Sequence, residues 1–163
     1  AFEPESLNFS CLNLNISDNN LNDKIFAFPI AINDEEKLST LNLSSMKFGG
    51  SGNSFDRKIT DSGLEFKPSY QQGSVSYSLD TICEKLNIVP ENIKIDVDGN
   101  ELKVINGMSN ILKNKNLKSI CVELNPNFNE HSKVMKILSN YFQDYKRYEW
   151  YDGQEVFNYI FKR

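Results

Sequence analysis

The chain has 163 residues, of which 39% are hydrophobic, 25% charged and 12% aromatic. This composition excludes a disordered segment, and no apolar run approaches the roughly 18 to 20 residues that span a membrane. A net charge of -4 excludes the strong attraction to phosphate on which nucleic-acid binding depends. We therefore expect one globular domain over residues 1–163, located in the cytoplasm, with neither nucleic acid nor membrane as a partner.

The first third of the chain is predicted to form a strand, a helix and a second strand. Residues 1–4 end an extended segment, and residues 5–16 carry apolar side chains at the spacing of one helical face. The apolar run IFAFPIAI at residues 25–32 is typical of a strand buried on both faces, although Pro29 favours an edge or a bulge.

Residues 33–74 lack a sustained period and are interpreted as an insertion or lid. Leu38, Leu41 and Leu43 indicate only a weak strand, and the stretch GGSGNS at residues 49–54 is typical of a flexible loop. Two interpretations remain open for this region: a mobile surface excursion, or a loop that covers a substrate.

The second half of the chain alternates between strands and helices. We expect, in order, an alternating segment from residue 75, a helix at 79–86, a strand at 93–97, a helix at 101–112, a strand at 120–124, a helix at 131–142 and strands at 145–150 and 156–161. Asp152-Gly153 between the last two strands is typical of a hairpin turn. This order predicts an α/β fold with a doubly wound, mainly parallel sheet. Its C-terminal hairpin is expected to place residues 156–161 antiparallel beside the 120–124 strand.

Acidic side chains lie at or just past the ends of several of the predicted strands. They are Glu3, Asp34, Asp96, Asp98 and Glu123. The carboxyl ends of parallel strands meet at one edge of a sheet, which is where ligands bind in open α/β folds. All of these acids except Asp34 are expected to converge on one cleft at that edge.

Glu3 and the acids around Gly99 each have two open interpretations. Glu3 is placed to accept hydrogen bonds from the two hydroxyls of a ribose, or to cap the helix that begins near Ser6. Asp96, Asp98 and Glu101 crowd three negative charges into six residues, which raises the pKa of a carboxyl and suits a general base. Helix capping would account for Asp98 and Glu101 but not for Asp96.

The string IKIDVDGNELKVINGM at residues 93–108 closely resembles the signature of the FkbM family of methyltransferases. The matching residues are Lys94, Asp96, Asp98, Gly99, Glu101 and Gly107. The segments AFEPESLNFSCLNLNI at 1–16, SLDTI at 78–82 and CVELNP at 121–126 are similar to the parts of the family that flank the signature. The resemblance implies a class I (Rossmann-like) methyltransferase sheet, S-adenosylmethionine as cofactor, and methyl transfer to a hydroxyl of a small molecule or sugar.

With this resemblance, site roles follow for the acids at the strand ends. We assign Glu3 and Asp34 to cofactor binding, and Asp96 to the base or hydroxyl-orienting role, with Asp98, Glu101 and Glu123 near it. The first strand of the family and its glycine-rich turn would lie upstream of Ala1. The chain is therefore expected to be a fragment or a reduced form that binds S-adenosylmethionine weakly.

Other interpretations compete with this one. The chain could be a non-catalytic remnant that binds a partner or forms a homo-oligomer through exposed sheet edges, or a nucleotide-sugar-binding transferase. A divalent cation bridging Asp96 and Glu123 is a minority interpretation, and we predict no metal site. His131, the one histidine, is expected to be an exposed residue at a helix start rather than a substrate-side base.

Overall fold

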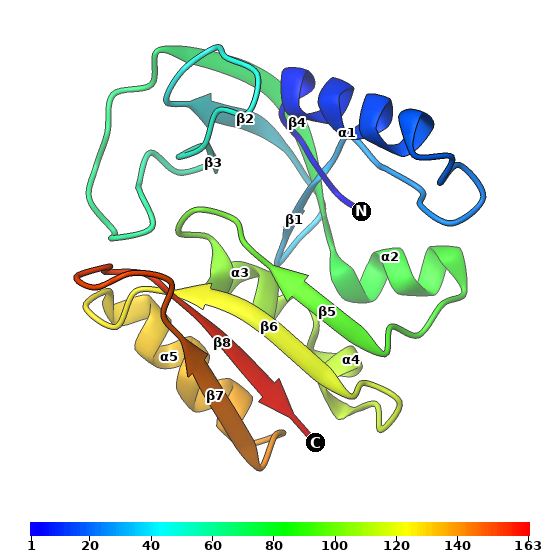
Figure 1. Ribbon diagram of the computed structural model, residues 1–163, viewed down its shortest axis with the longest axis vertical. Coiled ribbons are helices and arrows are strands. Elements are labelled where there is room, and N and C mark those ends of the chain that lie inside the picture. Colours follow the sequence, from blue (N-terminus) through cyan, green and yellow to red (C-terminus); the bar gives the residue numbers. More distant parts are fainter.

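The computed structural model describes residues 1–163 as two four-stranded sheets and five helices (Figure 1). The elements are α1 (Ser6–Asp18), β1 (Ala31–Asn33), β2 (Lys37–Leu43), β3 (Ser54–Phe55), β4 (Tyr70–Ser78), α2 (Leu79–Leu86), β5 (Asn92–Ile95), α3 (Glu101–Asn106), α4 (Ser109–Lys113), β6 (Ser119–Leu124), α5 (Asn129–Ser139), β7 (Asp144–Tyr148) and β8 (Phe157–Lys162). No helix is both long enough and apolar enough to span a membrane.

The α/β class is confirmed, but the prediction of one mainly parallel sheet is wrong. The first sheet has the order β1-β4-β2-β3, and only β1 and β4 are parallel. The second has the order β5-β6-β8-β7, and only β5 and β6 are parallel. The cause lies in residues 37–78, which fold back on themselves, so that β2 and β4 pair antiparallel from Lys37 opposite Ser76 to Leu43 opposite Tyr70.

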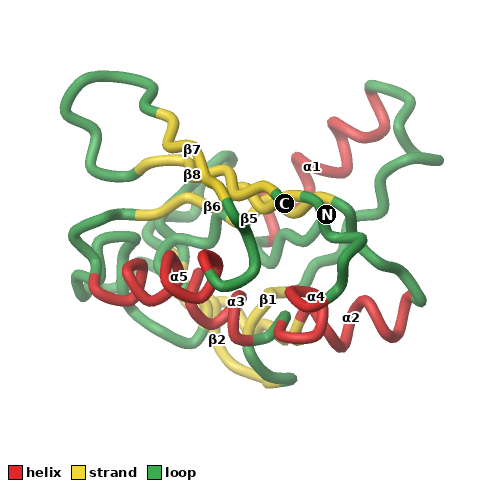
Figure 2. Tube along the Cα trace, turned by 90° about the horizontal axis from the view of Figure 1, so that it is seen from below, coloured by secondary structure: helices red, strands yellow, loops and turns green.

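The C-terminal half matches its prediction most closely. Helix α2 covers the predicted residues, and β8 runs antiparallel to β6 as expected. Gly153 makes the predicted turn between β7 and β8 with a positive φ of 81°. In β6, Ile120, Val122 and Leu124 are buried against the helical layer, whereas the residues between them point to the opposite face. Figure 2 shows helices α2 to α5 together on one side of the β5–β8 sheet and α1 on the other.

The helix predicted at 101–112 is broken into α3 and α4. A side chain at Gly107 would collide with the carbonyl oxygen of Asn33. Only glycine therefore lets the end of α3 approach the end of β1 this closely. The Asp80 carboxylate then accepts hydrogen bonds from the backbone N–H groups of Asn110 (2.9 Å) and Ile111 (3.0 Å). This cap restarts the helix after the interruption.

Candidate active site

A cavity of about 260 Å³ lies between the first sheet and the carboxyl end of β5. Its polar lining includes Glu3, Asn8, Asn53, Asp96, Asp98 and Asn100. Segments from the start of the chain, the glycine-rich stretch at 49–54 and the turn after β5 therefore meet at one place. Three of the four acids expected to share a cleft line this cavity.

The capping role considered for Glu3 belongs to Glu5. Glu5 is the N-cap of α1, because its carboxylate accepts from the backbone N–H groups of Leu7 (3.0 Å) and Asn8 (2.7 Å). Glu3 accepts only from the N–H of Glu5, at 2.8 Å, and its other oxygen is free to meet a ligand. Burial raises the pKa of Glu3 above its ordinary value.

The turn after β5 is strained and holds the glycine-rich stretch in place. Asp98 has a φ of 50° and Gly99 a φ of 94°, and a side chain at Gly99 would collide with the carbonyl oxygen of Thr60. The Asp98 carboxylate accepts from the backbone N–H groups of Gly52 (2.8 Å) and Asn53 (3.2 Å). Burial raises the pKa of Asp98, and these two hydrogen bonds oppose that rise. The 49–54 stretch is thus held at the wall of the cavity, which Gly50, Ser51 and Asn53 help to line.

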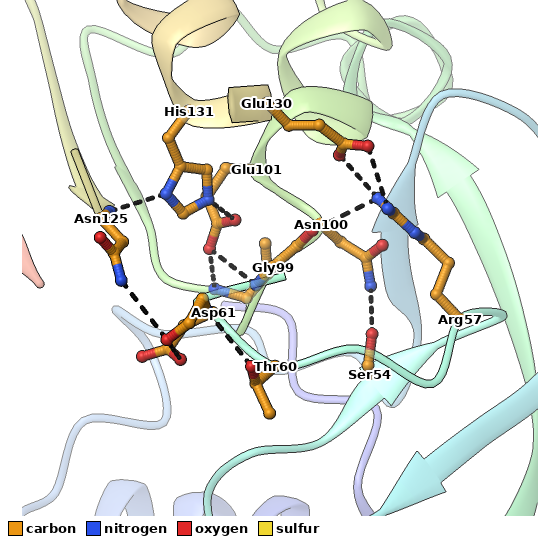
Figure 3. A network of polar contacts seen from close by, with 12 residues as sticks. Ser54, Arg57, Thr60, Asp61, Gly99, Asn100, Glu101, Asn125, Glu130 and His131 are labelled. Carbon is orange, nitrogen blue, oxygen red and sulfur yellow. Dashed lines mark hydrogen bonds and ion pairs between the residues drawn. The ribbon is translucent and has the colours of Figure 1, made fainter. Parts of the chain in front are cut away.

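A buried hydrogen-bonded pair, His131 and Glu101, holds the same turn from the side of α5 (Figure 3). His131 and Glu101 are 1% and 2% exposed, so the expectation of an exposed histidine is wrong. The His131 Nδ1 accepts from the backbone N–H of Asn125 (2.7 Å), which leaves Nε2 to donate to Glu101 Oε2 (2.8 Å). The structure therefore places Glu101 beneath the turn, outside the cavity lining.

Asp96 and Glu123 form a carboxyl pair at the rim of the cavity. Burial, the charge of Asp96 and a hydrogen bond that protonated Glu123 donates to Asp96 raise the pKa of Glu123 to about 7. Lys94 Nζ lies 2.7 Å from Asp96 Oδ2, and Asn158 Nδ2 donates to Glu123 Oε1 at 3.4 Å. Glu123 is not among the residues that line the cavity, so the structure places it beside Asp96 and outside the lining itself.

The raised pKa of Glu123 makes stability depend on pH near neutrality. Because the pKa of Glu123 is about 7 in the folded chain and 4.5 for an ordinary glutamate, the folded state binds an extra proton between these pH values. Glu123 therefore becomes destabilising as pH rises from about 4.5 to 7.

We expect Glu123→Gln to raise the melting temperature at pH 8 and to change it little at pH 4. Thermal denaturation at both pH values checks this, with the exposed Glu84→Gln as the control. An equal shift at both pH values would contradict it.

A family model described as "Methyltransferase FkbM domain" matches residues 1–147. The chain belongs to the FkbM methyltransferase family. The crystal structure of the methyltransferase FkbM from Methylobacillus flagellatus KT is similar in fold, with a TM-score of 0.58 at 13% sequence identity. The match covers 98% of this chain and 35% of the crystallised one, so the chain spans about a third of that protein's length. No curated protein matches the chain significantly.

In this FkbM chain, the predicted site residue Asp34 also lies outside the cavity, as Glu101 does. Asp34 is exposed, and its Oδ1 lies 3.6 Å from Lys103 Nζ, outside the lining of the cavity. Its place at the end of β1 is as expected. Its ion-pair partner Lys103 was not predicted, because Lys103 reaches Asp34 only through the close approach of α3 to β1.

Two polar residues of the FkbM site were missed by the sequence analysis. Asn100 is 4% exposed and donates to Ser54 Oγ (3.0 Å), yet its Oδ1 has no hydrogen-bond partner although the residue lines the cavity. Arg57 forms a bidentate ion pair with Glu130 on α5, at 2.7 and 3.0 Å (Figure 3). No pattern in the sequence marks either residue, because each depends on contacts between distant segments.

Proposed function

We propose that this FkbM family member is an S-adenosylmethionine-dependent O-methyltransferase acting on a hydroxyl of a small molecule or sugar. The observation that carries the proposal is the gathering of Glu3, Asp96 and Asp98 around one cavity, with Glu123 joined to Asp96 at its rim. Removing a proton from a hydroxyl close to a reactive methyl group requires a positioned base more than any other protein group. The carboxyl pair supplies that base.

The cavity suits the nucleoside end of S-adenosylmethionine. Its volume of about 260 Å³ falls below the roughly 300 to 1,000 Å³ of pockets that enclose a whole drug-sized ligand. Glu3 has a free carboxylate oxygen for ribose hydroxyls, and Asn100 offers a buried acceptor without a partner. When bound, the cofactor supplies a methyl group on a positively charged sulfur, a charge that the surrounding acids favour.

The other acids accept the proton, hold the 49–54 stretch and position the turn after β5. Burial and the nearby charge of Asp96 raise the pKa of Glu123 to about 7, so near neutral pH part of the Glu123 population is ionised and can accept the proton of a hydroxyl. Asp98 keeps the 49–54 stretch at the wall of the cavity, which reduces the access of water. Glu101 holds the turn that carries both aspartates and acts as a positioning residue.

Glu3→Gln tests the cofactor part of the proposal. We expect this chain to bind S-adenosylmethionine more weakly than micromolar, and Glu3→Gln to weaken binding a further tenfold or so. The reason is that hydrogen bonds to a charged acceptor contribute roughly 1.5 to 3 kcal/mol and are weaker with a neutral amide. Isothermal titration calorimetry measures both, with the exposed Glu65→Gln as a matched control. Equal affinities for the parent chain and Glu3→Gln would remove Glu3 from the cofactor site.

A second candidate, a binding or oligomerisation module, is favoured by one observation. Strand β5 pairs only with β6, and a groove of about 480 Å³ lies along its other side, lined mainly by apolar side chains that include Phe2, Leu79 and Ile93. The unpaired backbone groups of such an edge can form hydrogen bonds with an extended segment of another chain, whose side chains would fill the apolar groove. Sedimentation that depends on concentration would support this candidate.

A further inference from the structure

Three exposed aromatic side chains lie within four consecutive residues where β7 leads into β8. Trp150 is 77% exposed, Tyr151 69% and Tyr148 43%. Large rings left in water are unfavourable unless a ligand covers them, and Tyr and Trp are the side chains that most often serve as rigid contact surfaces. Trp150 is also the only tryptophan of the chain.

The loop that carries these rings is held by a buried amide. Gln154 is 9% exposed, and its Oε1 accepts from the backbone N–H groups of Trp150 (2.7 Å) and Tyr151 (3.3 Å). Its Nε2 donates to the carbonyl oxygen of Val156 at 2.7 Å. The backbone is thus fixed by an interior side chain while the rings stay outside, so the fold itself creates this exposed aromatic surface.

Strand register connects the aromatic rings to the carboxyl pair. Tyr148 lies directly opposite Asn158, and Asn158 lies directly opposite Glu123. Residues directly opposite one another share a face of the sheet, and the Asn158 side chain does reach Glu123. Two strand spacings separate Tyr148 from Glu123, or roughly 10 Å. The loop between β7 and β8 extends past the same edge of the sheet at which β6 ends (Figure 1).

The side chains from Glu123 across the sheet to Tyr148 and the loop beyond it favour one class of ligand. Carboxylates at one end accept hydrogen bonds from hydroxyls and repel anions, whereas aromatic faces at the other end stack on flat, apolar surfaces. Pyranose rings combine hydroxyls at the edge with C–H faces, and a chain of two rings matches the span. We propose that Tyr148, Trp150 and Tyr151 form a platform that docks a neutral saccharide, the methyl acceptor of the proposed function on which this inference rests.

The lone tryptophan makes the test direct, because its fluorescence reports binding at the platform without any methyl transfer. The chain is titrated with methyl glycosides of glucose, galactose, mannose and xylose, with maltotriose, and with glucose 6-phosphate. We expect a saturable change in Trp150 emission with at least one neutral saccharide and none with the phosphate. Tyr148→Ala and Tyr151→Ala should each weaken that binding roughly tenfold. Tyr70→Ala, which removes a half-exposed ring from the other sheet, should leave it unchanged.

The outcomes separate this inference from the proposed function. Absence of a saturable response to every neutral saccharide, or equal binding by Tyr148→Ala and Tyr151→Ala, overturns the platform. Methyl transfer to a hydroxyl compound that is not a saccharide, with no saccharide bound, also overturns the platform but keeps the function. Saccharide binding that depends on both tyrosines, without methyl transfer from S-adenosylmethionine, supports the platform and argues against the function.

Discussion

Asp96→Asn is expected to lower the rate of methyl transfer by roughly 10² to 10⁴, the contribution of a positioned base. The amide keeps the shape of the side chain but carries no negative charge and cannot accept a proton as a carboxylate does. Binding of S-adenosylmethionine should change little, since Glu3 and Asn100 lie on other parts of the cavity wall. Single-turnover kinetics with calorimetry of cofactor binding measures the two effects separately.

The same variant should also shift the pH dependence of the reaction. The negative charge of Asp96 is the largest cause after burial for the raised pKa of Glu123. Without it, Glu123 ionises at lower pH, so the acidic limb of any remaining activity moves to lower pH. Asp23→Asn, at an exposed position far from β5 in sequence, serves as the control for the loss of one negative charge. Unchanged turnover in Asp96→Asn would move the role of base to another residue.

Local sequence patterns predicted the elements better than their assembly. Helix α2 and the hairpin of β7 and β8 depend on a cap, a turn and alternating side chains, all within a few residues of one another. The break between α3 and α4 depends instead on the contact of Gly107 with Asn33, which is remote in sequence. The mixed sheets likewise arise from pairing between β2 and β4, whose register no local pattern specifies.

In the candidate site, too, local sequence patterns predicted some residues but not the contacts between distant segments. Glu3, Asp96, Asp98 and Glu123 were found because each was predicted to lie at the end of a strand, and the carboxyl ends of parallel strands share an edge. His131 was misplaced because its helix pattern gives no sign that the ring turns inward to Glu101. Asn100, Arg57 and Gln154 are neutral or basic residues in turns, where composition alone predicts exposure. Their roles arise only from the segments that fold against them.

His131→Ala is expected to destabilise the fold by roughly 3 kcal/mol, because it removes the closest hydrogen-bond donor of the buried Glu101 carboxylate, and an unsatisfied buried polar group costs about 1 to 3 kcal/mol, more when it is charged. Glu101 would stay 2% exposed and keep only two long hydrogen bonds, from the N–H groups of Val97 (3.4 Å) and Gly99 (3.3 Å). The N–H of Asn125 would also lose its acceptor. Because domains of this size are stable by only about 5 to 15 kcal/mol, much of the total would be lost. Urea denaturation measures this loss, with Ser132→Ala on the exposed side of α5 as the control.

A purely structural histidine and a positioning histidine differ in what happens before global unfolding. If His131 positions the turn through Glu101, its loss should loosen Asp98 first, because Glu101 holds the turn on which Asp98 sits. The amides of Gly52 and Asn53, which donate to Asp98, would then exchange with solvent faster in His131→Ala under native conditions. His131→Gln, which keeps a donor, should restore part of their protection. Equal exchange at these two amides in the parent chain and in both variants would show that the pair stabilises the core without controlling the 49–54 stretch.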